Sequence, residues 1–149
     1  MAALLALDQL PKFWVRATAP LHESTVLVPN LLDFTHVENR GVSFSVLGGL
    51  PDVWRVPLLV SFSVMAVAAL GYYWLRHRHG MGTFIHWAFL LILPGAVGNL
   101  IDRAVFGTVT DFLHFRFYET SFFVNNIADI EISLGVVAYL IGAVWAPKR

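Results

Sequence analysis

Two aspartates in the last third of the chain have the type and the position needed for chemistry. Asp111 ends the short polar run 107–111, and Asp129 lies at the start of a long apolar segment. An acid at a membrane boundary is costly to desolvate, so an aspartate at either position indicates a functional or structural role. Two carboxyls that meet can share one proton, because like charges held close together raise the pKa of one of them. Such a pair is typical of hydrolysis by paired aspartates.

The composition places these aspartates in a membrane protein. Of the 149 residues, 57% are hydrophobic and only 13% are charged, and the mean hydropathy is +0.66. Soluble domains have about 25% charged residues. The formal net charge is zero, so nucleic acid is not an expected partner. The chain has no cysteine, which excludes disulfides, thiolate metal sites and cysteine nucleophiles.

Four apolar segments supply the helices that would position the site. Residues 56–75 and 127–146 are each roughly 20 residues long, enough to cross a ~30 Å hydrocarbon core, and residues 84–101 are slightly shorter. Residues 1–15 are apolar but short and lack the features of a cleaved signal peptide, so we expect a membrane helix without its first turns. We therefore predict an all-α integral membrane protein, a single domain over residues 1–149 with four transmembrane helices.

Loop charges predict how these helices are oriented. The link 76–80 is short and basic, and the C-terminus ends in Lys148 and Arg149. Short loops rich in lysine and arginine stay in the cytoplasm. Both termini are therefore expected inside, with the long connections 16–55 and 102–126 on the outer side, where the candidate aspartates would also lie.

The two outer connections differ in pattern. Residues 25–50 contain several β-formers, turn residues at 39–41 and a clean alternation at 42–46, so we predict a small β-ribbon on the outer membrane face. Residues 102–126 interleave aromatic rings with charges, which suits the headgroup level of the membrane. We expect an amphipathic outer connection there.

Helical spacing brings further polar residues to the outer helix ends. Side chains three or four positions apart share a helix face. The residues related in this way are Asp8 and Lys12, then Asn99, Asp102 and Arg103, and finally Asn126 and Asp129. They present carboxylates, amides and cations toward one possible cavity. On the third helix, Gly95 and Gly98 would allow a neighbouring backbone to approach closely.

Each of these groups also has a purely structural explanation. Asn126 can cap the last helix, a role that does not exclude catalysis. Asp102 can form an ion pair with Arg103, and Asp8 can neutralise Lys12 one turn away. The pattern alone leaves both kinds of role open.

Metal and serine chemistry are less well supported. The six histidines include no His-Glu-x-x-His spacing, and neither a metal nor a cofactor is expected. No Gly-x-Ser-x-Gly motif is present, although Ser43 and Ser45 stay open as nucleophiles on pattern alone.

Four sequence blocks resemble those of the lipoprotein signal peptidases, also called type II signal peptidases. The blocks are Asp8-Gln9 with Lys12, then residues 39–45 (Asn-Arg-Gly-Val-Ser-Phe-Ser), then residues 95–103 followed by Gly107 and residues 109–112, and finally residues 126–129 with Gly135. They occur in the family's order over nearly the whole chain, which is far more specific than any one block. Among the departures from the family pattern is Glu131, which is expected to face away from Asp129 because residues two apart on a helix point roughly 200° apart.

The resemblance implies an aspartic endopeptidase of the bacterial inner membrane, with a periplasmic β-cradle and no cofactor. Such an enzyme removes the signal peptide from diacylglyceryl-modified prolipoproteins, cutting before the lipidated cysteine. It implies Asp111 and Asp129 as the catalytic dyad on the periplasmic side. Independently of the resemblance, Asp102 stays open as the alternative partner for Asp129. The supporting residues that it implies are Asp8, Lys12, Asn39, Gly41, Asn99, Asp102, Arg103 and Asn126. Membrane lipid and the cyclic lipopeptide globomycin are further expected ligands, and a monomer is expected.

Two other classes of membrane protein share some of these features. A proton-coupled carrier would also place acids in a helix, but carriers of this kind tend to have two related halves, and no internal repeat is evident here. A structural membrane protein would have little need for several amides and acids at one membrane edge. The peptidase is therefore the favoured hypothesis.

Overall fold

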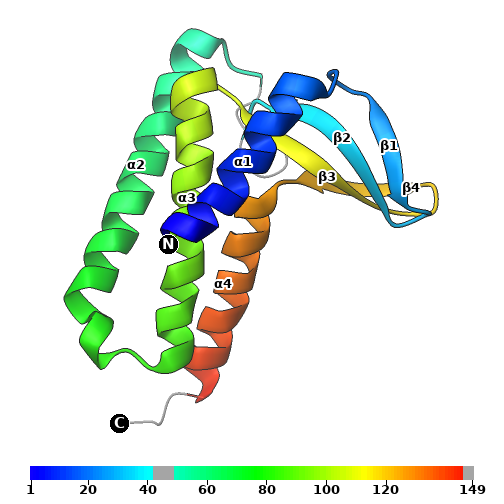
Figure 1. The fold of residues 1–149 in the computed structure, drawn as a ribbon. Helices are drawn as coiled ribbons and strands as arrows, with labels where there is room; N and C mark the ends of the chain where they lie inside the picture. The colour runs from blue at the N-terminus through cyan, green and yellow to red at the C-terminus, as the bar shows by residue number, and fades with distance from the viewer. Residues whose placement is uncertain (42–48, 146–149) are drawn as a thin grey trace.

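A computed structural model describes residues 1–41 and 49–145 of the chain. The elements in chain order are α1 (Ala2–Thr18), β1 (Ser24–Val28), β2 (Leu32–Asn39), α2 (Asp52–His77) with a 3₁₀ turn (Arg78–Gly80), α3 (Thr83–Phe106), β3 (Val109–Phe117), β4 (Thr120–Asn125) and α4 (Ile127–Trp145). In Figure 1, α2, α3 and α4 run alongside one another and the sheet projects to one side. Helix α1 packs against α3, α4 and β3, at the end of the helices where the sheet lies.

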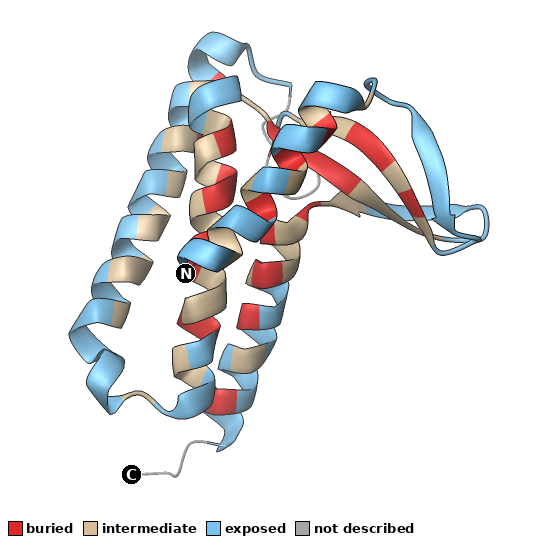
Figure 2. Ribbon diagram, viewed as in Figure 1, coloured by how far each residue is buried: buried red, intermediate tan, exposed pale blue. Residues whose placement is uncertain are grey.

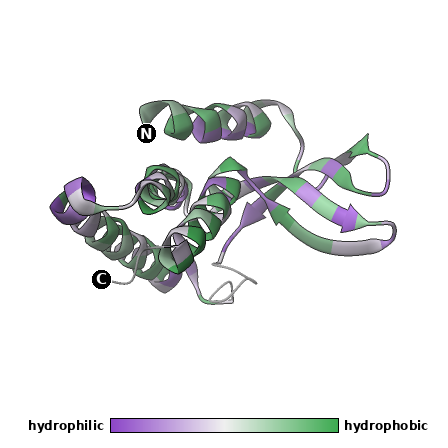
Figure 3. Cartoon of the chain, turned by 90° about the horizontal axis from the view of Figure 1, so that it is seen from below, coloured by the Kyte–Doolittle hydropathy of each residue, from purple (hydrophilic) through white to green (hydrophobic). Residues whose placement is uncertain are grey.

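Three of the helices are long and apolar enough to cross a membrane. They are α2 with its 3₁₀ turn, α3 and α4. Large apolar side chains such as Trp54, Phe62 and Val144 are exposed on them, and Figure 3 shows the helices as predominantly hydrophobic. A continuous exposed apolar surface of this kind fits contact with lipid.

The helices extend beyond the apolar segments predicted from sequence. Helix α2 begins at Asp52 rather than at residue 56, α3 continues to Phe106 rather than ending at 101, and α1 continues to Thr18. From sequence, each of these membrane helices was predicted to begin or end at the charged residue that borders its apolar segment. In the structure, the helix turns that carry these charges stay helical because other elements supply partners for the charged side chains. Asp102 of α3, for example, pairs with Lys12 and Arg16 of α1.

Glycines bring the helices of the bundle together. A Cβ atom at Gly95 would lie 2.6 Å from the Ala128 carbonyl oxygen, and one at Gly135 would lie 2.9 Å from the Ala88 carbonyl oxygen. Gly98 faces the Asp8 carboxylate in the same way. The prediction that a neighbouring backbone approaches closely is therefore confirmed for Gly95, whereas Gly98 makes room for side chains of α1. Buried positions follow the facing sides of α3 and α4, whereas α2 is mostly exposed (Figure 2).

The sheet is antiparallel, with four strands in the order β1-β2-β3-β4. Strands β1 and β2 lie within the stretch where a β-ribbon was predicted, but the turn between them is at residues 29–31 and not at 39–41. Residues 42–48, which include the alternating stretch and Ser43 and Ser45, lie outside the described residues. The connection predicted only as amphipathic folds as the hairpin β3–β4 and extends the ribbon. No hairpin was predicted here, because Tyr118 and Glu119 at the turn are not typical turn residues, although Tyr118 adopts φ 51°.

Candidate active site

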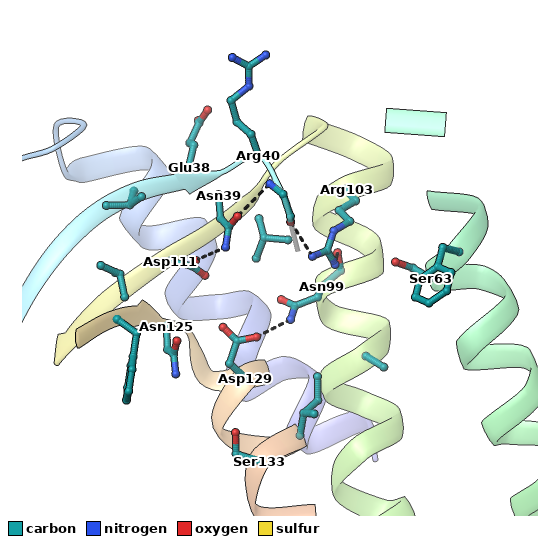
Figure 4. Close-up of a pocket in the computed structure, with 18 of the residues that line it drawn as sticks. Glu38, Asn39, Arg40, Ser63, Asn99, Arg103, Asp111, Asn125, Asp129 and Ser133 are labelled. Carbon is teal, nitrogen blue, oxygen red and sulfur yellow. Dashed lines mark hydrogen bonds between the residues drawn. The ribbon is translucent and has the colours of Figure 1, made fainter. Parts of the chain in front are cut away.

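A cavity of about 1060 Å³ is lined by residues of helices α2, α3 and α4 and of strands β2, β3 and β4. Asp111 and Asp129 both line it, together with Asn39, Asn99 and Arg103. Figure 4 shows the two aspartates on neighbouring elements, with their carboxyl groups directed into the same space. The structure therefore brings together residues that are widely separated in the sequence.

Asp111 is positioned by the turn that leads from α3 into β3. Helix α3 ends at Phe106 and is capped by Gly107, whose φ of 74° is the left-handed conformation that glycine adopts without strain. Asp111 is the third residue of β3 and is 2% exposed. Its carboxylate accepts hydrogen bonds from Asn126 Nδ2 at 2.6 Å and from Asn39 Nδ2 at 3.1 Å. Two amides therefore hold both of its oxygens.

Asp129 is positioned by the N-terminus of α4. Asn126 Oδ1 accepts a hydrogen bond from the Asp129 backbone N–H at 3.0 Å, and the Asn126 N–H lies 3.4 Å from Asp129 Oδ2. This reciprocal arrangement is a capping box, which confirms the expected capping role of Asn126. The other Asp129 oxygen accepts from Asn99 Nδ2 at 2.9 Å. The Asn126 side chain also donates to Asp111, so this one residue caps α4 and contacts both carboxyls, that of Asp111 through its side chain and that of Asp129 through its backbone N–H.

The surroundings of Asp111 favour its protonated form. Burial raises the pKa of the Asp111 carboxyl to about 7, and the negative charge of Asp129 acts in the same direction. The hydrogen bonds from Asn39 and Asn126 oppose this effect. Two carboxyls in this arrangement can hold one proton between them near neutral pH, so the pair can supply both an acid and a base.

A buried ionic network lies behind the aspartates, centred on Lys12. Lys12 is 0% exposed, and its Nζ donates to Asp8 Oδ2 at 2.8 Å and to Asn99 Oδ1 at 2.9 Å. It also pairs with Asp102 Oδ2 at 3.2 Å. Because Asn99 accepts from Lys12 through its oxygen, its amide nitrogen is directed toward Asp129. The network therefore orients one of the groups that bind the candidate dyad.

Asp102 belongs to this network and does not line the cavity. Its carboxylate pairs with Lys12 and with Arg16 Nη2 at 2.9 Å, and it accepts a hydrogen bond from the Thr110 backbone N–H at 3.1 Å. Asp102 and Arg103 were expected to share one face of α3, but in the structure they have different surroundings. Helix α1 packs against α3 on the side of Asp102, whereas Arg103 lies on the side that opens to the cavity. Asp102 instead supports the chain immediately before Asp111.

Arg103 lies in the cavity, where its guanidinium faces the charges of both aspartates. Its Nη1 donates to the Asn99 carbonyl oxygen and its Nη2 to the Gly41 carbonyl oxygen, each at 3.3 Å. The Gly41 N–H in turn donates to Asn39 Oδ1 at 3.0 Å. The turn after β2 therefore contacts both Asp111, through Asn39, and Arg103.

Some residues of the site were not assigned roles from the sequence. Gln9 Nε2 donates to the Gly98 carbonyl and to the carboxylates of Asp8 and Asp102. Arg16 follows Lys12 by four residues, a spacing that could have identified it as a second cation on the same helix face. Glu131 is buried, packs against Gly95 and is not among the residues that line the cavity, in keeping with its expected direction.

Comparison with known proteins identifies the family. The model of the signal peptidase (SPase) II family matches residues 1–145. The chain belongs to this family. A lipoprotein signal peptidase of Gloeobacter violaceus is 41% identical over 152 residues, which cover 100% of this chain and 83% of that protein. Another, of Solibacter usitatus, is 36% identical over 151 residues, with 99% and 89% covered.

The fold agrees with this membership of the signal peptidase II family. A solved structure of a bacterial membrane enzyme, determined by the in meso method at 1.9 Å, aligns with a TM-score of 0.84 and 25% identity, and covers 98% of this chain and 90% of that chain. The predicted resemblance is therefore confirmed. The protein is a peptidase of the signal peptidase II type and, with its three membrane-length helices, a multi-pass membrane protein.

Proposed function

We propose that this protein is a membrane aspartic endopeptidase that removes the signal peptide from diacylglyceryl-modified prolipoproteins, cutting before the lipidated cysteine. Its relatives carry the name lipoprotein signal peptidase. The single observation that carries the aspartic mechanism is the cavity in which Asp111 and Asp129 are held by three asparagine side chains. Asp111 is buried and Asp129 is half-buried, and two acids held this close to one space are costly unless they act together.

The proposed reaction follows from one proton shared by the dyad. The ionised carboxylate takes a proton from a water molecule, whose oxygen attacks the scissile carbonyl carbon. The protonated carboxyl gives its proton to the developing oxyanion. As the carbon–nitrogen bond breaks, the nitrogen takes the proton that the first carboxyl removed from water, and a hydroxyl of the tetrahedral intermediate returns a proton to the second carboxyl. The dyad returns to its single-proton state when the products leave. The pair titrates as one unit, so the resting proton is assigned to the dyad and not to either residue.

The supporting residues divide into two groups by what they contact. Asn39, Asn99 and Asn126 donate to the carboxylates and hold their oxygens in place. Arg103 faces the cavity and is the proposed donor to substrate carbonyls and to the charge that builds up in the transition state. Lys12 acts through Asn99 and does not reach the reacting atoms.

The membrane arrangement is proposed from the same features. We place α1 as a fourth membrane helix of a single domain, with both termini in the cytoplasm and the cavity on the periplasmic side. The basic link Arg76–Gly80 supports this orientation, because it lies at the end of the bundle opposite the sheet (Figure 1). In this arrangement the sheet is a periplasmic cradle, the substrate's acyl chains lie in the bilayer, and a monomer is sufficient for activity. A globomycin-type inhibitor would occupy the same cavity.

Cleavage by purified protein tests the function. In lipid nanodiscs we expect a diacylglyceryl-modified prolipoprotein to be cut, with the new N-terminus at the modified cysteine by mass spectrometry. The same prolipoprotein without the lipid is expected to remain intact and is the matched control. If the unlipidated protein is cut equally well, the proposed substrate class is wrong.

The pH dependence tests the shared proton. Since the raised pKa of Asp111 is about 7, the dyad keeps its proton below that pH and loses it above, and kcat/KM is expected to fall on the alkaline side. Because the unfolded pKa is about 3.9, ionisation of Asp111 also costs folding stability as the pH rises from there through the folded value. Asp111→Asn should therefore gain stability relative to wild type between about pH 5 and pH 8. An activity that is flat across this range would contradict the mechanism.

A further inference from the structure

Arg55 is a buried cation that the proposed mechanism does not use. It lies near the start of α2 and is 1% exposed. A guanidinium removed from water needs acceptors for its donors. Its ion-pair partner Asp52, at 2.9 Å from Nη2, has a side chain that is 63% exposed. The ion pair with this exposed carboxylate does not by itself account for the burial of Arg55.

The remaining acceptors of Arg55 are two backbone carbonyls from different parts of the chain. Its Nη1 donates to the carbonyl oxygen of Arg40 and, at 3.0 Å, to that of Gly107. Arg40 directly follows β2, and Gly107 ends α3 just before β3. The last registered pair of the two strands is Asn39 with Val109. Arg55 therefore joins the two chain segments immediately beyond the point where strand pairing stops.

The segment held by Arg55 contacts one member of the candidate dyad, Asp111, and the arginine of the cavity, Arg103. Asn39 donates to Asp111, the Gly41 N–H donates back to Asn39, and the Gly41 carbonyl accepts from Arg103. The bonds from this segment to Asp111 and Arg103 are therefore made by residues on either side of Arg40. A small displacement of the Arg40 carbonyl would move both contacts together.

We propose that Arg55 is a positioning residue of the active site, which holds the segment 39–41 so that Asn39 meets Asp111 and Gly41 orients Arg103. The expected effect of Arg55 on catalysis rests on the proposed function. The expected effect of Arg55 on the position of Asn39 and Gly41 does not. A purely structural role would make Arg55 an anchor for the start of α2 only. The two roles differ in whether the environment of Asp111 changes when Arg55 is replaced.

A substrate-free titration measures that environment. The carboxyl infrared band that disappears in Asp111→Asn is followed against pH in wild type, Arg55→Gln, Asn39→Ala and the double variant. Loss of the Asn39 donor removes a bond that lowers the pKa of Asp111, so we expect Asn39→Ala and Arg55→Gln each to raise its proton affinity about five- to tenfold. The double variant should match the larger single effect, because both changes remove the same bond.

Two further variants separate position from charge. Arg40→Gln removes a nearby cation that also binds Asp52, but the Arg40 side chain extends away from Asp111 (Figure 4), so the titration should stay at its wild-type position. Arg55→Lys keeps the positive charge but lacks the planar guanidinium that donates to two carbonyls and a carboxylate. It is also the variant to measure if Arg55→Gln does not fold. It should shift the titration in the same direction. The other charges facing Asp111, which are Asp129, Lys12 and Arg103, are unchanged in all these variants.

The outcomes are distinct. A wild-type titration in Arg55→Gln or Arg55→Lys, or additive shifts in the double variant, would overturn the positioning role. In the cleavage assay, Arg55→Gln should lower kcat about 10- to 100-fold with a smaller change in KM, because misplaced catalytic groups affect the chemical step. If wild type does not cleave the lipidated substrate, the proposed function fails, while the titration, which needs no substrate, still decides the role of Arg55.

Discussion

Replacement of either Asp111 or Asp129 by asparagine is expected to abolish cleavage of the lipidated prolipoprotein while leaving the fold intact. Asparagine keeps the size of the side chain but cannot accept or give up the proton that the reaction requires. A positioned acid–base group contributes up to about 10⁴-fold in rate, so a loss of about 1,000-fold or more in kcat is expected for each variant. Single-turnover cleavage in nanodiscs measures it. The double variant should be no slower than either single variant, since the two residues act as one unit.

Asp102→Asn is the matched control for the dyad. It makes the same chemical change in another aspartate, which is fully buried, pairs with Lys12 and Arg16 and does not line the cavity. We expect less than about a 10-fold loss in kcat, because Asp102 supports Asp111 only through the Thr110 backbone. Should Asp102→Asn abolish cleavage while Asp111→Asn retains it, Asp102 would be the partner of Asp129. Circular dichroism and thermal unfolding of each variant exclude misfolding as the cause.

The largest expected effect on stability follows from Lys12→Met. Methionine fits a similar volume but leaves Asp8 and Asp102, both 0% exposed, without their shared cation. Removal of one member of a buried ion pair costs about 3–5 kcal/mol, because the remaining charge is left uncompensated. Unfolding by sodium dodecyl sulfate in mixed micelles measures the loss. Activity should fall as well, since Asn99 loses the partner that directs its amide nitrogen toward Asp129.

The same change in an altered background identifies the cause of the loss. In Asp102→Asn, one of the two carboxylates that pair with Lys12 is already neutral, so Lys12→Met should cost clearly less there than in wild type. Arg16→Met is a second control, because Arg16 is partly exposed and pairs with Asp102 alone among these carboxylates. An unchanged free energy of unfolding in Lys12→Met would show that the network does not stabilise the fold.

Local features of the chain could be predicted from sequence because their causes are local. The apolar segments predicted the membrane helices, and Asn126 three residues before Asp129 predicted the helix cap. Gly95 and Gly98 predicted close helix packing. The ordered blocks of the signal peptidase II family predicted the peptidase. Each of these depends on composition, on one turn of helix or on a motif that can be read along the chain.

Tertiary structure alone decided which polar groups share a partner. Lys12 contacts Asn99 across 87 residues of sequence, and Arg55 bonds the Gly107 carbonyl across 52. No periodicity encodes such contacts, because they depend on which face of a helix its neighbours cover. Packing of α1 against α3 separates Asp102 from Arg103 despite their adjacent positions.

The sequence by itself thus determined the kind of protein and the candidate dyad, since hydropathy, capping and motifs act within one segment. Only the folded chain decided the β3–β4 hairpin, the burial of Arg55 and the link that Asn126 makes between Asp111 and Asp129. The physical reason is that a buried polar group takes its partner from whichever segment comes within hydrogen-bond distance.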